Sequence, residues 1–310
     1  MRKLNKSLVL FLAFAMLISF AACSNSEGGD QTGGSSDSIY PLTITDDLGN
    51  EVVIESEPEK IVSVAPSSTE IIFELGLGEK LVGRSEFCNY PEEAAEVEVV
   101  GGFSGPNTEL ILELEPDVLF AAGSVPEEEK ALLEGSGIKV IVYNPEDIDG
   151  VLKNIELTGK VLNVSETASD IVESLQAKRQ EIVSMVSGEE AKRVFIDLGS
   201  FISAGSGSFI DSILSELGAE NVAAKGEGQW PTLTLEQVVD ANPQVYISLY
   251  PTIEELNETP GLSEVSAFQN DQVVVIPWGI EEHDFVQRPG PRVIQGLELY
   301  AEIIYPSLFE

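Results

Sequence analysis

The sequence predicts an α/β protein of two similar lobes, each with a mostly parallel central sheet, joined by one long α-helix. From about residue 60, short apolar strands alternate with helical stretches, as in βα units. The same order of strand, turn and helix begins again near residue 193. A chain of 310 residues is also longer than one core usually supports, which favours two domains.

Residues 1–22 are typical of a secretory signal. Three basic residues precede an apolar run, residues 7–20, which is too short to cross a membrane comfortably. The small residues before Cys23 look like a lipobox, which implies that Cys23 is diacylated and becomes the first mature residue. An ordinary signal peptide with an incidental cysteine is the alternative. Residues 23–39 are rich in Gly, Ser and Asp, which predicts a flexible tether behind the lipid anchor.

The charge balance excludes several classes of partner. With 17 basic and 53 acidic residues, the formal net charge is −36, so the surface repels nucleic acids and anionic lipid. The single histidine, His283, excludes sites that need several imidazoles, and we expect no resident metal site. If Cys23 is lipidated, Cys88 is the only remaining thiol; we expect it to be small, partly buried and neither catalytic nor a ligand.

The N-terminal lobe is predicted to span residues 40–164. It opens with a hairpin over residues 42–54, where apolar residues alternate on both sides of an Asp/Gly/Asn turn. Asn144 and Pro145 favour a helix start, as N-cap and first helical residue. Three apolar runs are predicted to be strands of the parallel sheet: Ile61–Val64, Val118–Ala121 and Val140–Val142.

A connecting helix, residues 165–188, leads to a C-terminal lobe, residues 189–310. A helix of about 22 residues is roughly 33 Å long and forms a stiff link, which permits rocking of the lobes but not wide hinge closure. The second lobe is predicted to begin with a strand at 194–197, a small-residue turn at 203–208 and a helix at 209–217.

The two lobes repeat a sequence pattern. Phe103 and Trp230 each stand six residues before a glutamate, Glu109 or Glu236, and a proline follows each glutamate by seven residues. Both lobes also end a helix with Glu-Leu-Gly, where the glycine is a usual left-handed terminator. The pattern predicts an internal duplication.

Four short motifs carry a resemblance to a known family: Ala65-Pro-Ser-Ser-Thr-Glu70, Asn89-Tyr-Pro91, Leu114-Glu-Pro-Asp-Val118 and Arg288-Pro-Gly-Pro-Arg292. In this order, behind a lipobox, they make residues 41–310 similar to the substrate-binding lipoproteins of ABC importers for vitamin B12, haem and ferric siderophores. The resemblance implies two Rossmann-like lobes bridged by one helix. It also implies a monomer, lipid-anchored outside the cytoplasm, that carries cargo rather than a cofactor and serves a permease dimer with its ATPase subunits.

Aromatic side chains are the first candidates for contact with cargo. A wide apolar cargo such as a corrin ring needs flat, rigid walls, which aromatic residues supply. Phe103 and Trp230 form a matched pair across the two lobes, and Phe87 resembles a position where a cobalamin-binding member places a cleft aromatic. Trp278 and Phe285 precede the last helix and are candidates for the second wall. Core packing is the alternative for each of them.

Polar candidates surround the last of the four motifs. The resemblance implies that Asp284 accepts hydrogen bonds from corrin amides, and that Arg288 pairs with propionates or iron-chelating oxygens. A capping Asp and a surface Arg are the alternatives, and Arg292 is expected to be structural. Tyr90 is placed with the ligand-binding residues. Both Tyr90 and His283 are conceivable axial ligands, although a lone histidine in an acidic run favours simple solvation.

The resemblance also gives Glu109 and Glu236 a role. One glutamate on each lobe would pair with arginines of the two permease subunits, because a pseudo-twofold pair of carboxylates suits a twofold dimer. The competing interpretation is an acid that stabilises the first turn of each helix.

The sequence therefore predicts a solute-binding lipoprotein with a corrinoid cargo, and a ferric siderophore or haem as the alternative cargo. A secreted enzyme is disfavoured, since the chain has neither a Gly-x-Ser-x-Gly elbow nor a phosphate loop. A surface lipoprotein without a transport role is the remaining alternative.

Overall fold

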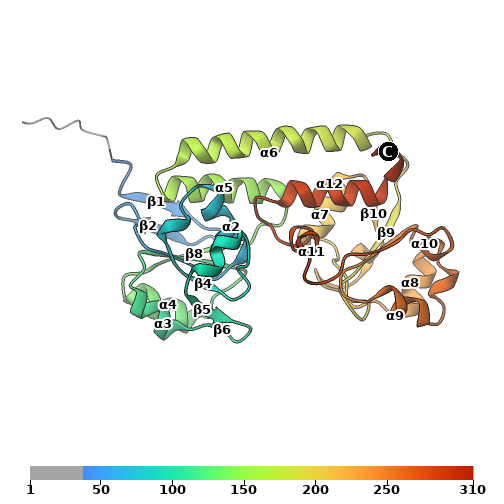
Figure 1. Ribbon diagram of the computed structural model, residues 1–310, viewed down its shortest axis with the longest axis horizontal. Helices are drawn as coiled ribbons and strands as arrows, with labels where there is room; N and C mark the ends of the chain where they lie inside the picture. Colours follow the sequence, from blue (N-terminus) through green and yellow to red (C-terminus); the bar gives the residue numbers. More distant parts are fainter. Residues whose placement is uncertain (1–37, 310) are drawn as a thin grey trace, which may run out of the picture. The chain divides into compact units, whose positions relative to one another are not determined.

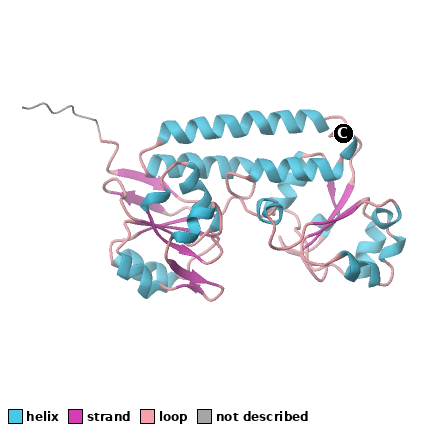
Figure 2. Ribbon diagram, in the orientation of Figure 1, coloured by secondary structure: helices cyan, strands magenta, loops and turns pink. Residues whose placement is uncertain are grey.

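The computed structural model describes residues 38–309, which contain a hairpin and two sheets flanked by helices (Figures 1 and 2). The predicted signal peptide, Cys23 and most of the predicted tether lie outside these residues. The predicted hairpin is confirmed: β1 (Leu42–Thr45) and β2 (Glu51–Ile54) pair antiparallel, and alternate residues face the core. Asp46 closes the turn by accepting hydrogen bonds from the backbone of Leu48 and Asn50.

The N-terminal lobe has a six-stranded sheet in the order β6-β5-β4-β3-β7-β8. All neighbouring strands pair parallel except β5 and β6. The three predicted strands correspond to β3, β7 and β8. Strands β4 and β5 were not predicted, because glycines interrupt their apolar runs. The strands are β3 (Ile61–Ser63), β4 (Leu81–Ser85), β5 (Val99–Gly102), β6 (Gly105–Pro106), β7 (Val118–Ala122) and β8 (Lys139–Tyr143).

The helices of this lobe are α2 (Pro66–Glu74), α3 (Thr108–Leu114), α4 (Glu127–Gly135) and α5 (Ile148–Val161). The predicted helix start at Asn144 is wrong by three residues. Asp147 is the N-cap of α5, and its side chain accepts from the backbone N–H of Gly150 at 2.7 Å. The backbone N–H of Asn144 instead donates to Asp47 of the hairpin turn at 2.8 Å, which anchors the preceding segment outside the helix.

The C-terminal lobe has a four-stranded, wholly parallel sheet in the order β10-β9-β11-β12. Its strands are β9 (Arg193–Asp197), β10 (Glu220–Asn221), β11 (Val245–Ser248) and β12 (Val273–Val275). Its helices are α7 (Phe209–Glu216), α8 (Leu235–Ala241), α9 (Ile253–Glu258), α10 (Ser266–Gln269), α11 (Glu281–Phe285) and α12 (Val293–Ile304). Short 3-10 turns lie at Gly78–Lys80, Glu92–Glu96, Val222–Lys225, Leu262–Glu264 and Pro306–Leu308.

The two sheets share a four-stranded core, as the sequence repeat predicts. The order β4-β3-β7-β8 of the first lobe matches β10-β9-β11-β12 of the second, and β5 and β6 extend the first sheet beyond β4. The glutamate helices α3 and α8 both have seven residues. Both end in a left-handed residue, Glu115 or Asn242, directly before a proline. The terminators Gly76 and Gly218 also have similar positive φ angles, 76° and 70°.

The predicted connecting helix is confirmed as α6 (Ser165–Val186), which lies along α5 of one lobe and α12 of the other (Figure 1). Arg179 of α6 pairs with Asp149 of α5 and Glu216 of α7. One continuous buried apolar cluster runs through these helices, and its members include Leu75, Ile155, Val172, Ile182, Ile213 and Leu297. Because the lobes share this core, the joint between them is packed rather than loose. Within residues 38–309, no helix is both long and apolar enough to span a membrane.

Candidate functional site

Exposed aromatic side chains gather at one edge of each sheet. Among residues 38–309, six aromatics are markedly exposed; five lie in loops that follow a strand, and Trp230 lies in the loop between the 3-10 turn Val222–Lys225 and α8. In parallel sheets these loops meet at the carboxyl edge, where α/β proteins bind ligands. The six are Phe87, Tyr90 and Phe103 in the first lobe, and Trp230, Tyr250 and Trp278 in the second.

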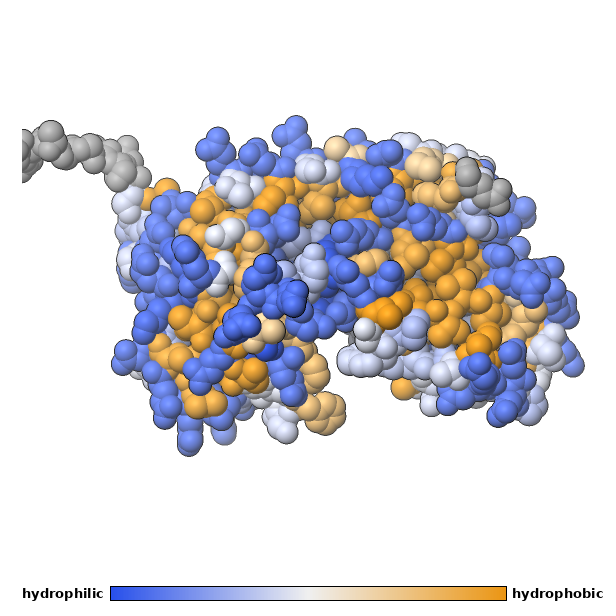
Figure 3. All heavy atoms as spheres, viewed as in Figure 1, coloured by the Kyte–Doolittle hydropathy of each residue, from blue (hydrophilic) through white to orange (hydrophobic). Residues whose placement is uncertain are grey.

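A cavity of about 340 Å³ lies between the lobes. In the space-filling view a notch separates the lobes on the side away from α6 (Figure 3). The cavity brings together five of the predicted ligand-binding residues, from the loop after β4 and from the segment between β12 and α12. Its lining comprises Glu86, Phe87, Asn89 and Tyr90 from the first lobe, and Trp278, Gly279, Ile280, Glu281, Asp284, Arg288 and Arg292 from the second.

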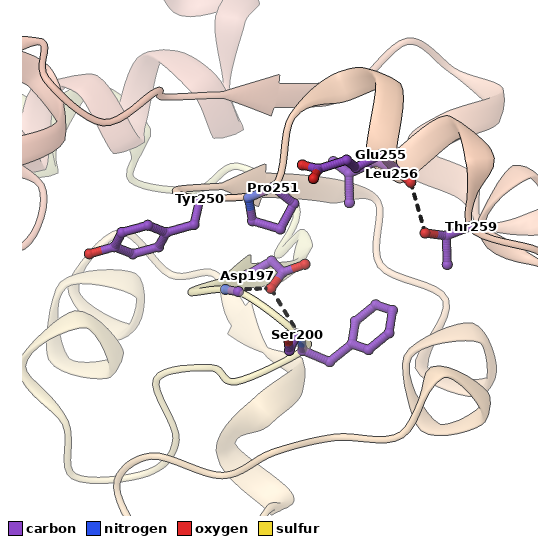
Figure 4. Close-up of a pocket in the computed structure, with 9 residues that line it drawn as sticks. Asp197, Ser200, Tyr250, Pro251, Glu255, Leu256 and Thr259 are labelled. Atoms are coloured by element: carbon purple, nitrogen blue, oxygen red, sulfur yellow. Dashed lines mark hydrogen bonds between the residues drawn. The ribbon is translucent and has the colours of Figure 1, made fainter.

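A second cavity, of about 380 Å³, lies within the C-terminal lobe at the carboxyl ends of β9 and β11 (Figure 4). Tyr250 lines this second cavity and stacks on Trp278 of the first, with 6.2 Å between ring centroids. At its base the buried carboxylate of Asp197 accepts from the backbone N–H groups of Gly199 and Phe201 and from the hydroxyl of Tyr246. Burial raises the pKa of Asp197, while these hydrogen bonds oppose the increase.

A buried ionic network fixes the floor of the inter-lobe cavity. Glu70 of α2 accepts from Arg292 Nε at 2.9 Å and from Arg292 Nη2 at 2.7 Å. It also accepts from Arg288 Nη1 at 3.2 Å. Arg292 donates in addition to Glu281, and its guanidinium lies 3.8 Å from the centroid of the Tyr90 ring. Burial lowers the pKa of Arg292, but the hydrogen bond to Glu70 and the charges of Glu70 and Glu281 together outweigh it and leave the pKa raised. Arg292 is thus paired at the start of the last helix, as predicted, and it also lines the cavity.

Asp284 and Arg288 are paired with one another in the cavity wall. Arg288 Nη2 lies 2.9 Å from Asp284 Oδ1, and Arg288 Nη1 donates to Asn89 Oδ1 at 2.7 Å. Asn89 in turn donates to Asp284 Oδ2 at 3.2 Å, so this network crosses between the lobes. A bound cargo would meet these groups already hydrogen-bonded.

The expectation that His283 is simply solvated is wrong. Its side chain is 1% exposed, and its ring packs edge-on against Tyr250 and Trp278, with 5.1 Å between centroids in each case. Nε2 donates to the carbonyl of Leu249, and Nδ1 accepts from Gln287. Burial lowers the pKa of His283, so the neutral ring is favoured. Both ring nitrogens are engaged, and the imidazole supports the aromatic wall.

The structure leaves other predicted residues outside the two cavities. Phe103 is 94% exposed at the tip of the β5–β6 hairpin, where its backbone N–H donates to Glu86 Oε1 at 2.8 Å. Trp230 is 56% exposed in the loop before α8. Phe285 packs partly buried against the core rather than lining the second wall. Cys88 is fully buried, not partly so, and burial raises the pKa of its thiol.

Glu109 and Glu236 occupy equivalent places in the two lobes. Each is the second residue of its helix and is exposed, behind the N-cap Asn107 or Thr234. Neither forms an ion pair with another residue of the described chain. The equivalence fits both predicted roles, since an acid in the first turn also favours the helix dipole.

Sequence reasoning missed Glu70 and Tyr250. Glu70 is an acid inside an otherwise buried helical stretch, which is a signal for a buried partner. Tyr250-Pro251 follows β11 much as Tyr90-Pro91 follows β4, and this likeness could have marked it. No group of three potential metal-ligating side chains occurs within residues 38–309.

A scan of family models matches residues 61–278 to "Periplasmic binding protein". This match covers more than half of the chain. The chain belongs to the periplasmic binding protein family. It is 33% identical to the uncharacterized ABC transporter substrate-binding lipoprotein YvrC of Bacillus subtilis, over 97% of this chain and 96% of that one. It is 31% identical to a vitamin B12-binding protein of Vibrio cholerae, over 77% and 87% of the two chains.

Among solved structures, the periplasmic vitamin B12 binding protein BtuF of Vibrio cholerae superposes with a TM-score of 0.70 at 28% identity. The superposition covers 82% of this chain and 99% of that one. The predicted fold class is thus confirmed. The protein is a substrate-binding protein of the ABC importer type, not an enzyme, and what it binds is cargo rather than a cofactor.

Proposed function

We propose that this protein captures a corrinoid between its lobes and delivers it to an ABC permease. The observation that carries the proposal is the inter-lobe cavity walled by Phe87 and Tyr90 from one lobe and Trp278 from the other. Flat aromatic faces on two sides suit a wide, rigid ring. The relatives named for vitamin B12 binding, at 28–31% identity, support the same class of cargo.

The internal pairing of the cavity favours an amide-rich ring over haem. Haem needs an axial side chain, yet both nitrogens of His283 are engaged inside the wall, and Tyr90 lies against the Arg292 guanidinium. Asp284 and Asn89 carry acceptor oxygens at the cavity, which can receive N–H groups from corrin amides. Haem or a ferric siderophore remains the second candidate cargo.

We place Phe103 and Trp230 at the rim of the cleft. Both are exposed in loops outside the cavity lining, Phe103 after β5 and Trp230 before α8. In this position they would border the exposed edge of a bound ring and limit the access of water to it. The hydrogen bond from the Phe103 backbone to Glu86 already anchors the tip of the β5–β6 hairpin.

The proposal extends to anchoring and docking. Cys23 would carry the lipid anchor, and residues 23–39 would tether the folded body outside the cell membrane. This body consists of lobes 40–164 and 189–310, joined by helix 165–188. The exposed pair Glu109 and Glu236 would contact arginines of the two permease subunits. Cys23→Ser should abolish lipid labelling and release the protein while its cargo affinity stays the same. Continued labelling of this variant would contradict the anchor.

The cargo is tested by calorimetry on the purified mature chain. The panel is cobinamide, cobalamin, haemin and two ferric siderophores, each titrated under the same conditions. We expect saturable one-to-one binding of a corrinoid, and weaker or absent binding of haemin and the siderophores. Binding of a siderophore alone would replace the corrinoid as cargo and leave the importer role intact. Failure of every compound would contradict the proposed function.

A further inference from the structure

We infer that the cleft selects a cargo without net negative charge, and that it discriminates against ring compounds that carry several free carboxylates. The inference rests on the proposed function, since it specifies the charge class of cargo for the same cleft. It depends on how the charged side chains of the two cavities are already paired.

Carboxylates outnumber guanidinium groups around the inter-lobe cavity. The acidic side chains that line it or form its floor are Glu70, Glu86, Glu281 and Asp284. The basic side chains in its lining are Arg288 and Arg292, and no lysine is present in the described lining. The cavity therefore presents a negative field to an incoming cargo.

Most N–H donors of both arginines are already engaged by protein groups. Arg292 uses Nε and Nη2 on Glu70 and Nη1 on Glu281, while one face of its guanidinium covers the Tyr90 ring. Both terminal nitrogens of Arg288 are also occupied, because Nη1 contacts Glu70 and Asn89 and Nη2 contacts Asp284. A cargo carboxylate would compete with these protein carboxylates for the guanidinium groups and would add negative charge beside them. Displacing the buried carboxylate of Glu70 would cost desolvation without a new charge pair.

A third arginine lies nearby but does not change this balance. Arg84 of β4 is buried, and its guanidinium donates to the backbone carbonyls of Ser85, Glu86 and Ala95. It is absent from the described lining of both cavities. It stabilises the loop that carries Phe87 from behind and does not face cargo.

The lining of the adjoining cavity in the C-terminal lobe is also negatively charged. Its charged lining residues are Asp197 and Glu255, and its described lining contains no basic side chain. Between the two cavities stand the stacked rings of Tyr250 and Trp278, both largely exposed. Aromatic faces attract cations and not anions. Both cavities thus favour a neutral or cationic cargo.

The test is a matched pair of corrins that differ only in peripheral charge. One is cobinamide, whose ring side chains are amides, and the other is the same corrin with these amides hydrolysed to carboxylates. Calorimetry on the full mature chain should give a Kd for the carboxylated corrin that is roughly 100-fold higher, which corresponds to about 2.8 kcal/mol. Raising the ionic strength should narrow the difference, because salt screens the exposed part of the field.

Two variants probe the origin of the discrimination. Glu86→Gln removes a charge and keeps an acceptor for the Phe103 backbone, and Asp284→Asn removes a second charge from the cavity wall. Each should shift the ratio of the two affinities toward the carboxylated corrin by about tenfold. Glu173→Gln, an exposed acid on α6 outside both described cavity linings, is the matched control and should leave the ratio unchanged.

The outcomes separate the two claims. Equal affinity for the two corrins, or tighter binding of the carboxylated one, would overturn the charge inference and leave the corrinoid assignment standing. An unchanged ratio in both cavity variants would also overturn it, because the discrimination would then not come from these carboxylates. If neither corrin binds, the proposed function fails, and the inference fails with it.

Discussion

Arg292, at the start of the last helix of the C-terminal lobe, holds the carboxylate of Glu70 in the N-terminal lobe through two hydrogen bonds of 2.9 and 2.7 Å. Both side chains are buried, and the same carboxylate also accepts from Arg288. One acid of α2 thus binds two guanidinium groups of the other lobe. This contact fixes the lobes to each other at the floor of the cleft, in addition to the core that they share along α6.

Glu70→Gln should lower the free energy of unfolding by about 3 kcal/mol, since it leaves buried guanidinium charge without its partner. Urea denaturation followed by circular dichroism measures the change. Glu173→Gln on the exposed face of α6 is the control and should stay within about 0.5 kcal/mol of the wild type. A loss smaller than about 1 kcal/mol for Glu70→Gln would show that the ionic network contributes little.

His283→Gln should weaken the pH dependence of stability on the acid side of neutrality. Burial holds the pKa of His283 below its ordinary value of 6.5, so below that pH the unfolded chain binds a proton that the folded chain does not. The wild type therefore loses stability as the pH falls from about 7.5 to about 5. Melting temperatures of the wild type and the variant at both pH values measure this loss of stability. If the melting temperature of the variant falls just as much, groups other than His283 cause the pH dependence.

Trp278→Phe should remove more of the fluorescence quenching caused by a bound corrinoid than Trp230→Phe does. Trp278 lines the inter-lobe cavity and stacks on Tyr250, whereas Trp230 lies outside the cavity lining. These are the two tryptophans of the chain, so each variant isolates the signal of the other. A larger loss of quenching in Trp230→Phe would place the cargo on the rim rather than in the cavity.

The double change Glu109→Ala and Glu236→Ala should abolish uptake and leave corrinoid affinity nearly unchanged. The two carboxylates are exposed and absent from the described linings of both cavities, so their loss removes contacts to the permease and not to cargo. Uptake of labelled corrinoid and calorimetry on the same variant separate the two effects. A tenfold loss of affinity would mean that the docking and cargo surfaces are not distinct.

Much of the fold could be predicted because it depends on local patterns. The repeat that ends in Glu-Leu-Gly and the spacing around Glu109 and Glu236 marked two equivalent lobes, and both sheets have the predicted parallel order. Strands β4 and β5 were missed, since their glycines interrupt the apolar pattern, and the three-residue strand β12 was also missed. Their positions depend on pairing with strands that are distant in the sequence, and the local sequence pattern does not indicate this pairing.

The site was predictable only where it is a property of one loop. Aromatic residues beside short motifs such as Asn89-Tyr-Pro91 are visible in the sequence, and Phe87, Tyr90 and Trp278 do line the inter-lobe cavity. The burial of His283 and the pairing of Glu70 with Arg292 arise from segments far apart in the chain. No local signal tells a solvated histidine from one packed between two rings.

The measurement that tests the central claim most directly is a double-mutant cycle across the cleft. Cobinamide is titrated calorimetrically against the wild type, Phe87→Ala from one lobe, Trp278→Ala from the other, and the double variant. If one ring is held between the lobes, each single change should weaken binding by about tenfold or more, with one-to-one stoichiometry throughout. Unchanged affinity in either single variant would mean that the cargo binds to one lobe only, which contradicts the account.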